Sequence, residues 1–225
     1  MLSDDEIARR WREARARIDA ESVVRPTDVV LVAVTKSFPV DAWAAVVRAG
    51  GRDVGENYAQ EVVTKTAEFA RRFPELTRPR VHFIGRLQSN KVRSLARSVD
   101  LWQSVDRRST VDEIARRAPE AHVLVQVNAT GEADKGGCDP ADVPTLIAHA
   151  RERGLIVEGL MVVGPTDGDR DRTRDAFRRT VELADREGLA VRSMGMSGDL
   201  DDALAAGSTM VRVGSALFGD RPPVV

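Results

Sequence analysis

The sequence has 225 residues, 42% of them hydrophobic, so it can bury a full core in one large α/β domain or in two small ones. Its 34 basic and 35 acidic residues nearly balance, which excludes an overall field that would favour nucleic acid or an anionic membrane. The single cysteine, Cys138, excludes an internal disulfide framework and fits a reducing compartment.

The first residues, MLSDDEIARRW, lack the apolar core of a signal peptide. No stretch of the chain approaches the apolar length that spans a bilayer. We therefore expect a soluble cytoplasmic protein that binds neither membrane nor nucleic acid.

The first predicted element is a helix over residues 3–21. Ser3 and Glu6 have the spacing of a capping box at its start. Apolar side chains recur along one stripe of this helix at Ile7, Trp11, Ala14 and Ile18. Pro26 ends the helical register before the first strand.

From this point strand and helix patterns alternate to the end of the chain. Strands are predicted over residues 29–36, 52–57, 81–85, 101–106, 122–128, 157–164, 190–197 and 209–217. Helices are predicted between them over residues 41–50, 58–72, 110–117, 141–153, 171–187 and 200–206, with one more through Lys91 and Leu95.

Strands separated by helices indicate parallel pairing, and eight such units are what a closed barrel needs. We therefore predict an α/β fold: a single (β/α)8 TIM-type barrel over residues 1–225, with an extra N-terminal helix in residues 1–25 packing on it. A short tail, RPPVV, follows the last unit. An open doubly wound sheet is the alternative, but no phosphate loop of the GxGxxG or GxxxxGK[ST] type follows the first strand.

Lys36 closes the apolar run VVLVAVTK at the end of the first strand. Burial favours the neutral, nucleophilic form of a lysine, which imine formation with an aldehyde requires. The alternative is that Lys36 only marks the strand end and reaches into solvent, as most lysines do.

Two loops that follow the last two strands combine glycine with serine just before a helix. They are MSGD (196–199), with Ser197 and Gly198, and GSALFG (214–219), with Gly214 and Ser215. In such barrels phosphate is commonly held by the loops after strands seven and eight, and glycine lets the backbone come close to an anion. The alternative is that Ser197 with Asp199, and Ser215, merely cap helices.

Arg212 lies in the valine-rich strand VRVG, in phase with Gly214, so we expect it to point into the barrel. An inward arginine needs an acceptor, and the ring nitrogen or phosphate of a cofactor is a candidate. A salt bridge to Glu56 or Asp106 is the alternative. Because the first strand neighbours the eighth, Lys36 would share the barrel mouth with the phosphate loops, which fits pyridoxal 5'-phosphate (PLP).

Several strings in the chain resemble those of the pyridoxal phosphate homeostasis proteins. They are VAVTK (32–36), GENYAQE (55–61), HFIGRLQSNK (82–91), QVN (126–128), GLM (159–161), SMGMSGD (193–199) and GSTMVRVGSALFG (207–219). The resemblance runs in order from about Val29 to Arg221, and it implies a barrel similar to the N-terminal domain of alanine racemase.

The resemblance also implies roles for particular residues. Lys36 would be the Schiff-base lysine, Arg212 would lie close to the pyridine nitrogen, and Asn57, in the GEN string, would lie near the cofactor. Phosphate contacts are implied for Ser197, Gly198, Gly214 and Ser215. His82 is expected to be a core residue, and Arg86 departs from the small residue or proline of many relatives.

The function implied is intracellular PLP homeostasis without an established catalytic reaction, with PLP and PLP-dependent apoenzymes as partners. The alternatives are a PLP-dependent amino-acid racemase and a cofactor-free aldolase that binds a sugar phosphate. Tyr58 is the one tyrosine in the chain, and a two-base racemase would need a second acid/base group opposite the lysine. The three histidines have no ligand spacing, so no metal site is expected. We expect a monomer, with a dimer as the alternative.

Overall fold

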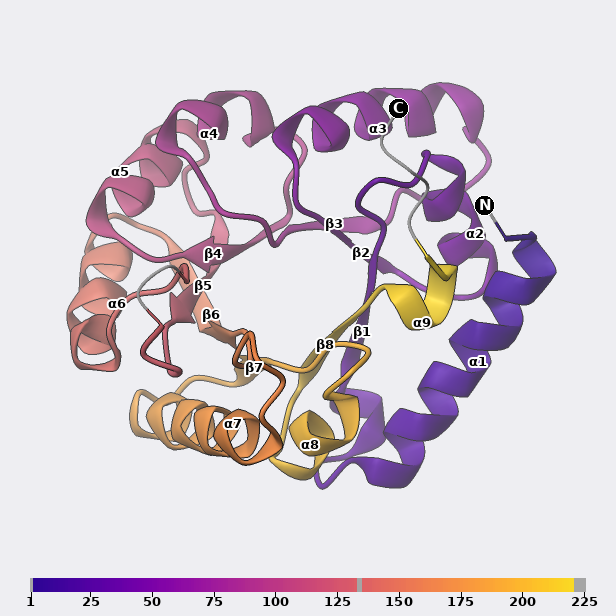
Figure 1. The fold of residues 1–225 in the computed structure, drawn as a ribbon. Coiled ribbons are helices and arrows are strands. Elements are labelled where there is room, and N and C mark those ends of the chain that lie inside the picture. Colours follow the sequence, from indigo (N-terminus) through magenta and orange to yellow (C-terminus); the bar gives the residue numbers. More distant parts are fainter. Residues whose placement is uncertain (1, 133–134, 221–225) are drawn as a thin grey trace.

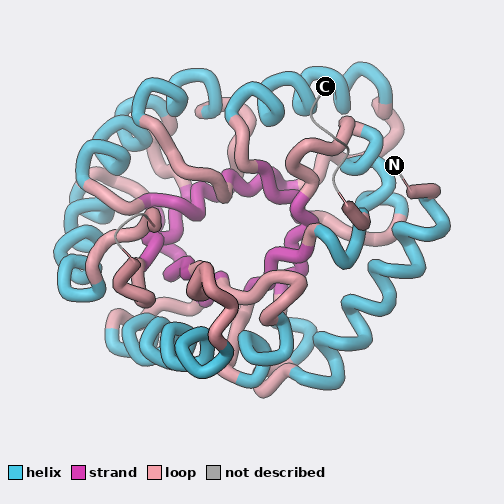
Figure 2. Tube along the Cα trace, in the orientation of Figure 1, coloured by secondary structure: helices cyan, strands magenta, loops and turns pink. Residues whose placement is uncertain are grey.

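The structure is a computed structural model that describes residues 2–132 and 135–220; the predicted tail RPPVV lies outside these residues. Within them, eight parallel strands close into a barrel in the order β1 to β8, with β1 paired to both β2 and β8. The strands form the inner ring and the helices the outer ring (Figures 1 and 2). The predicted (β/α)8 barrel is confirmed.

The strands are short, and each begins after a turn that follows a helix. They are β1 (Val30–Val34), β2 (Asp53–Glu56), β3 (Arg80–Phe83), β4 (Leu101–Val105), β5 (His122–Val127), β6 (Ile156–Val162), β7 (Val191–Ser193) and β8 (Met210–Val213). The last strand is shorter than predicted, because the chain turns at Gly214 into a helix although its apolar residues continue.

The helices cover the outside of this ring. They are α1 (Asp4–Glu21), α2 (Asp41–Arg48), α3 (Ala59–Arg72), α4 (Ser89–Leu95), α5 (Arg108–Arg117), α6 (Val143–Glu152), α7 (Arg170–Arg186), α8 (Leu200–Ala205) and α9 (Ser215–Phe218). Two short 3-10 helices, Pro26–Asp28 and Pro140–Asp142, precede β1 and α6. Among the described helices none is long and apolar enough to cross a membrane.

Helix α1 packs on the outside of the barrel where its first and last units meet. It contacts α2, α8 and α9. The side chains that it buries are Ile7, Trp11, Ala14 and Ile18. The Ser3 hydroxyl accepts a hydrogen bond from the Glu6 N–H at 3.3 Å, so the predicted cap and the predicted apolar stripe are both confirmed.

The apolar core has one large part and two small clusters. The larger part fills the space between the outer faces of the strands and the helices. A smaller cluster inside the barrel consists of Val32, Leu101, Leu124, Met161 and Met210. Since side chains alternate between the two faces of a strand, the next inward positions toward the C-terminal ends, such as Arg212, come to lie at the barrel mouth.

Candidate functional site

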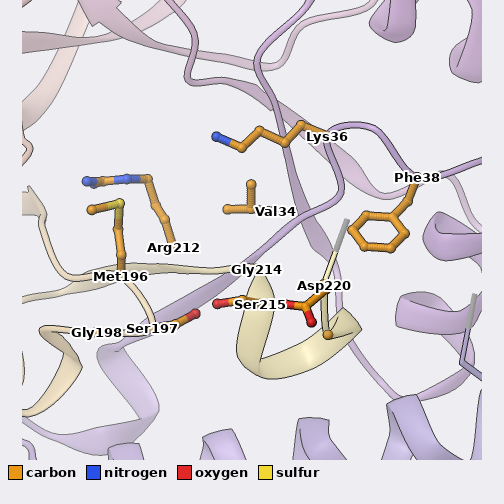
Figure 3. A pocket seen from close by; sticks show the side chains of 11 residues that line it. Val34, Lys36, Phe38, Met196, Ser197, Gly198, Arg212, Gly214, Ser215 and Asp220 are labelled. Carbon is orange, nitrogen blue, oxygen red and sulfur yellow. The ribbon is translucent and has the colours of Figure 1, made fainter. Parts of the chain in front are cut away.

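A cavity of about 400 Å³ lies at the C-terminal mouth of the barrel, beside β1, β7 and β8. It is lined by Lys36, Ser197, Gly198, Arg212, Gly214 and Ser215, so each predicted site residue except Asn57 lines it. Figure 3 shows these residues around one space. The lining also includes residues that sequence reasoning did not select: Val34, Phe38, Met196, Gly219 and Asp220.

Lys36 stands two residues beyond the end of β1. Its side chain is half-buried and lines the cavity. In Figure 3 it extends over the cavity, to the side on which Arg212 and Met196 lie. The alternative that Lys36 simply reaches into solvent at a strand end does not fit this placement.

The two serine loops contact each other. The Ser197 hydroxyl accepts a hydrogen bond from the Ala216 N–H at 3.3 Å, which joins the loop after β7 to the start of α9. The residues at the N-cap positions of α8 and α9 are Asp199 and Gly214, and neither side chain caps its own helix. The capping alternative therefore holds in part, because Ser197 accepts an N–H from the first turn of α9, whereas the Ser215 side chain is exposed at the cavity.

The two glycines of these loops have different surroundings. A Cβ atom on Gly198 would meet nothing within 4 Å, so the space beside its backbone is open. A Cβ atom on Gly214 would lie 3.3 Å from Val34 Cβ, because the ends of β8 and β1 are close together there. Gly198 thus leaves room for a ligand, whereas Gly214 lets two strand ends approach.

Arg212 points into the barrel and is 4% exposed. Its Nη1 donates to Ser193 Oγ at 2.6 Å and its Nη2 donates to the Val162 carbonyl at 2.8 Å. Burial lowers the pKa of Arg212 to about 10, which still leaves it charged at neutral pH. The inward orientation predicted from the strand phase is confirmed.

The predicted alternative for Arg212, a salt bridge to Glu56 or Asp106, is wrong. Glu56 pairs with Lys65 at 2.8 Å and Asp106 pairs with Arg107 at 2.6 Å. Across the described parts of the chain, no carboxylate forms an ion pair with Arg212. A buried guanidinium with five N–H donors and two neutral acceptors has donors left for a ligand in the cavity.

A chain of hydrogen bonds continues from Arg212 across the barrel interior. Ser193 Oγ donates to Gln103 Oε1 at 2.7 Å, and Gln103 Nε2 lies 2.7 Å from His82 Nδ1. His82 Nε2 lies 2.8 Å from Asp53 Oδ1. His82 is fully buried, as expected of a core residue, and burial lowers its pKa below the ordinary value, opposed by Asp53.

Asn57 does not line the main cavity. It lines a separate cavity of about 380 Å³ between α3 and α4, together with Tyr58, Arg86 and Lys91. Gly85 lies tightly against it, since a Cβ atom there would be 2.1 Å from the Asn57 carbonyl oxygen. The predicted cofactor contact of Asn57 therefore stays a prediction, and Arg86 lies at this second cavity.

The other two histidines, His122 and His149, each pair with a carboxylate. His122 Nδ1 pairs with Glu158 at 2.5 Å, and His149 Nε2 pairs with Asp112 at 2.9 Å. No group of three or more His, Cys, Asp or Glu side chains that could hold a metal ion occurs within residues 2–132 and 135–220.

Comparison with known proteins identifies the relatives of this chain. The family model "Alanine racemase, N-terminal domain" matches residues 3–222. The "Pyridoxal phosphate homeostasis protein" of Pseudomonas aeruginosa is 41% identical over 216 residues, covering 92% of each chain. The chain belongs to the pyridoxal phosphate homeostasis protein family. The resemblance found in the sequence motifs is therefore confirmed.

Solved structures of other proteins have the same barrel fold as this member of the pyridoxal phosphate homeostasis protein family. PipY of Synechococcus elongatus, solved with PLP bound, is 31% identical with a TM-score of 0.82, covering 95% of this chain and all of PipY. An alanine racemase of Clostridium difficile shares the fold alone, at 15% identity and a TM-score of 0.74, covering 97% of this chain and 57% of the racemase. The relatives of the family are named for homeostasis and not for a reaction.

Proposed function

We propose that this chain binds PLP through a Schiff base to Lys36 and acts in intracellular PLP homeostasis, as a carrier without catalytic turnover. The observation that carries the proposal is the shared cavity, in which a half-buried lysine, two glycine-serine loops and a buried arginine meet. The relatives support it, because they are named for PLP homeostasis and one of them, PipY, binds PLP.

The residues present fit this cofactor on three independent points. The cavity offers about 400 Å³ beside the Lys36 side chain. Gly198 leaves open space beside the serine hydroxyls, where a phosphate needs close approach to backbone and hydroxyl groups. Arg212 has donors left for a ring nitrogen, and its positive charge is buried with no carboxylate in ion-pair contact among the described residues, although the charge of Asp199 favours it.

Each residue has a distinct task in the proposal. Ser197 and Ser215, with the backbone at Gly198 and Gly214, would hold the phosphate. When bound, PLP supplies an aldehyde that the Lys36 amine condenses with, releasing water. Within this set, the half-buried Lys36 and the two loops would fix both ends of one small molecule.

Arg212 favours a carrier over an enzyme. It would donate a hydrogen bond to the ring nitrogen, but a guanidinium with a pKa of about 10 keeps its proton at neutral pH. A ring nitrogen that stays unprotonated makes a weaker electron sink, which slows chemistry at the α-carbon of an amino acid. Tyr58, the one tyrosine of the sequence, is 53% exposed at the second cavity, so it does not face Lys36 across the main cavity as a second acid/base group.

The experiment that tests the proposal compares Lys36→Ala with Lys91→Ala, an exposed lysine on α4. The parent protein and Lys91→Ala should form a visible Schiff-base absorption with PLP that borohydride fixes on the peptide containing Lys36. Lys36→Ala should show neither. A reducible bond that persists in Lys36→Ala would place the linkage elsewhere and refute the proposal.

The racemase alternative predicts a different result with the same parent protein. If the chain were a racemase, L-alanine in deuterated water would exchange its α-hydrogen at an enzymatic rate. We expect exchange no faster than that of free PLP at equal concentration. The aldolase alternative predicts no absorption change with PLP and a reducible bond to a sugar phosphate instead.

We further propose that residues 1–225 act as one cytoplasmic domain, as a monomer, and that PLP-dependent apoenzymes receive the cofactor. The free thiol of Cys138 is compatible with a reducing cytoplasm. Light scattering of the PLP-loaded protein tests the monomer, and activation of a PLP-free transaminase tests delivery.

A further inference from the structure

The turn that carries Lys36 has an unfavourable backbone conformation. Ser37, the next residue, has a φ of 66°, and Glu120 is the other non-glycine residue with positive φ within the described ranges. L-residues with a Cβ atom seldom adopt this left-handed conformation, because the Cβ atom approaches the following carbonyl oxygen. Such a conformation persists only where the surroundings fix it.

Glu61 fixes the backbone on one side of Lys36. It lies in the first turn of α3, and its carboxylate accepts the Ser37 N–H with both oxygens, at 2.9 Å to Oε2 and 3.2 Å to Oε1. Although burial raises the pKa of Glu61, the Lys65 ammonium and the Ser37 N–H hold it below the ordinary value. Glu61 is therefore a charged acceptor at neutral pH, and charged acceptors make the stronger hydrogen bonds.

Lys65 fixes the backbone on the other side. Its Nζ donates to the Thr35 carbonyl at 2.8 Å and to Glu61 Oε2 at 2.8 Å. The same Nζ contacts Glu56 Oε1 at 2.8 Å, and Glu56 accepts the Thr35 hydroxyl at 2.6 Å. Thus the residue before Lys36 and the residue after it are both held by one cluster, formed by Glu56, Glu61 and Lys65.

The burial of the charged groups in this cluster is not explained by a gain in the stability of the fold. Lys65 is 5% exposed and Glu56 is fully buried, with its Oε2 atom lacking a hydrogen-bond partner. Removing such charges from water costs much of what their attraction returns, so a buried ion pair is weak evidence for stability. What this cluster does provide is a fixed geometry at the one turn that carries the proposed nucleophile.

We infer that Glu61 and Lys65 are positioning residues, which hold Ser37 in its left-handed conformation within the Thr35–Ser37 turn and so keep the Lys36 amine over the cavity. The inference rests on the proposed function, because it assigns these residues to PLP capture. Neither residue lines the cavity, so they act on Lys36 through the backbone.

The test uses Glu61→Ala, with Glu68→Ala on the same helix as the matched control. We expect Glu61→Ala to lower the apparent affinity for PLP at least tenfold, and Glu68→Ala to change it less than twofold. Adding Ser37→Gly to Glu61→Ala should restore most of the loss, because glycine adopts positive φ without the steric penalty. A merely structural role for Glu61 predicts no such rescue.

A second variant keeps the test decisive if Glu61→Ala folds poorly. Ser37→Val leaves the cluster intact but places a β-branched residue at positive φ, where it fits worst. It should capture PLP at least tenfold more weakly while its far-ultraviolet circular dichroism matches that of the parent protein. Normal PLP capture by Ser37→Val would overturn the inference.

A third measurement needs no cofactor. Amide hydrogen exchange of the Ser37 N–H should be slow in the parent protein and in Glu68→Ala, and at least tenfold faster in Glu61→Ala. Failure of the proposed function looks different, since the parent protein would then form no reducible bond at Lys36. Failure of the present inference leaves that bond intact and makes Glu61→Ala behave like Glu68→Ala in both capture and exchange.

Discussion

At Gly198 the requirements of folding and those of the proposed ligand can be distinguished most clearly. Its surroundings are empty within 4 Å of a hypothetical Cβ atom, and its φ lies outside the left-handed region. Nothing in the fold therefore requires glycine there. The requirement comes from the proposed phosphate, which would occupy the space that a side chain would fill.

Gly198→Ala should consequently leave the free energy of unfolding within about 0.5 kcal/mol of the parent value, as for surface substitutions without special contacts. The same variant should weaken PLP retention about tenfold. Urea unfolding of the cofactor-free protein and dialysis of the loaded protein measure the two effects. Unchanged retention would show that the phosphate lies elsewhere.

Arg212 shows how far residue-level reasoning reaches from sequence alone. Its inward direction follows from its phase with Gly214, a local property of one strand, and was predicted correctly. Its partner Ser193 lies on β7, a different strand, and is joined to Gln103 of β4 across the barrel. Contacts between strands far apart in sequence depend on barrel register, which no local pattern contains.

At the scale of elements, the pairing of β6 with β7 depends on one close approach. Gly159 pairs with Val191, and a Cβ atom on Gly159 would lie 1.9 Å from the Val191 carbonyl oxygen. No small shift of a side chain relieves a clash with backbone. This explains a glycine inside a strand, where the residue is otherwise unfavourable.

Gly159→Ala should lower the free energy of unfolding by about 1–3 kcal/mol, the range for overpacking in a tight interior. Gly198→Ala serves as the control, because it makes the same chemical change in open space. Urea unfolding of both variants provides the comparison. Equal stabilities would mean that β6 and β7 can move apart without cost.

Element boundaries were the weaker part of the sequence prediction. Strand β8 was expected over residues 209–217 but covers Met210–Val213, because the apolar pattern continues through a residue that begins a helix, Ser215. The existence and order of the elements were predicted well, since the periods of two and 3.6 residues differ clearly over most segments. Asn57 shows the limit, since the strand predicted over residues 52–57 ends at Glu56 and Asn57 lies at another cavity.

At the scale of the whole molecule, the hydrogen-bonded chain from Arg212 to Asp53 couples the barrel interior to pH. His82 lies within it, and burial holds its pKa below the ordinary value of about 6.5, with Arg80 acting in the same direction and Asp53 and Asp100 opposing. Below pH 6.5 the unfolded chain therefore binds more protons at this residue than the folded barrel does. Its contribution to stability is complete above pH 6.5 and is lost as the pH falls below it.

We expect the free energy of unfolding to fall between pH 7 and pH 5 more steeply in the parent protein than in His82→Gln, which keeps hydrogen-bonding groups but does not titrate. The difference between the two slopes isolates His82 from the carboxylates that titrate in both proteins. Urea unfolding at several pH values measures it. Parallel slopes would contradict a neutral buried His82.

Strand β1 pairs with β8, so Lys36, which follows the first strand, lies beside Gly214 and Ser215, which follow the last strand. With the proposed site, a nascent polypeptide that stops before β7 would carry the amine at Lys36 but neither serine loop, so cofactor capture would wait for barrel closure. Once captured, the cofactor would bridge the first and last units and resist their separation, by an amount that grows with the logarithm of its free concentration. The supply of PLP would thus set the stability of the folded barrel.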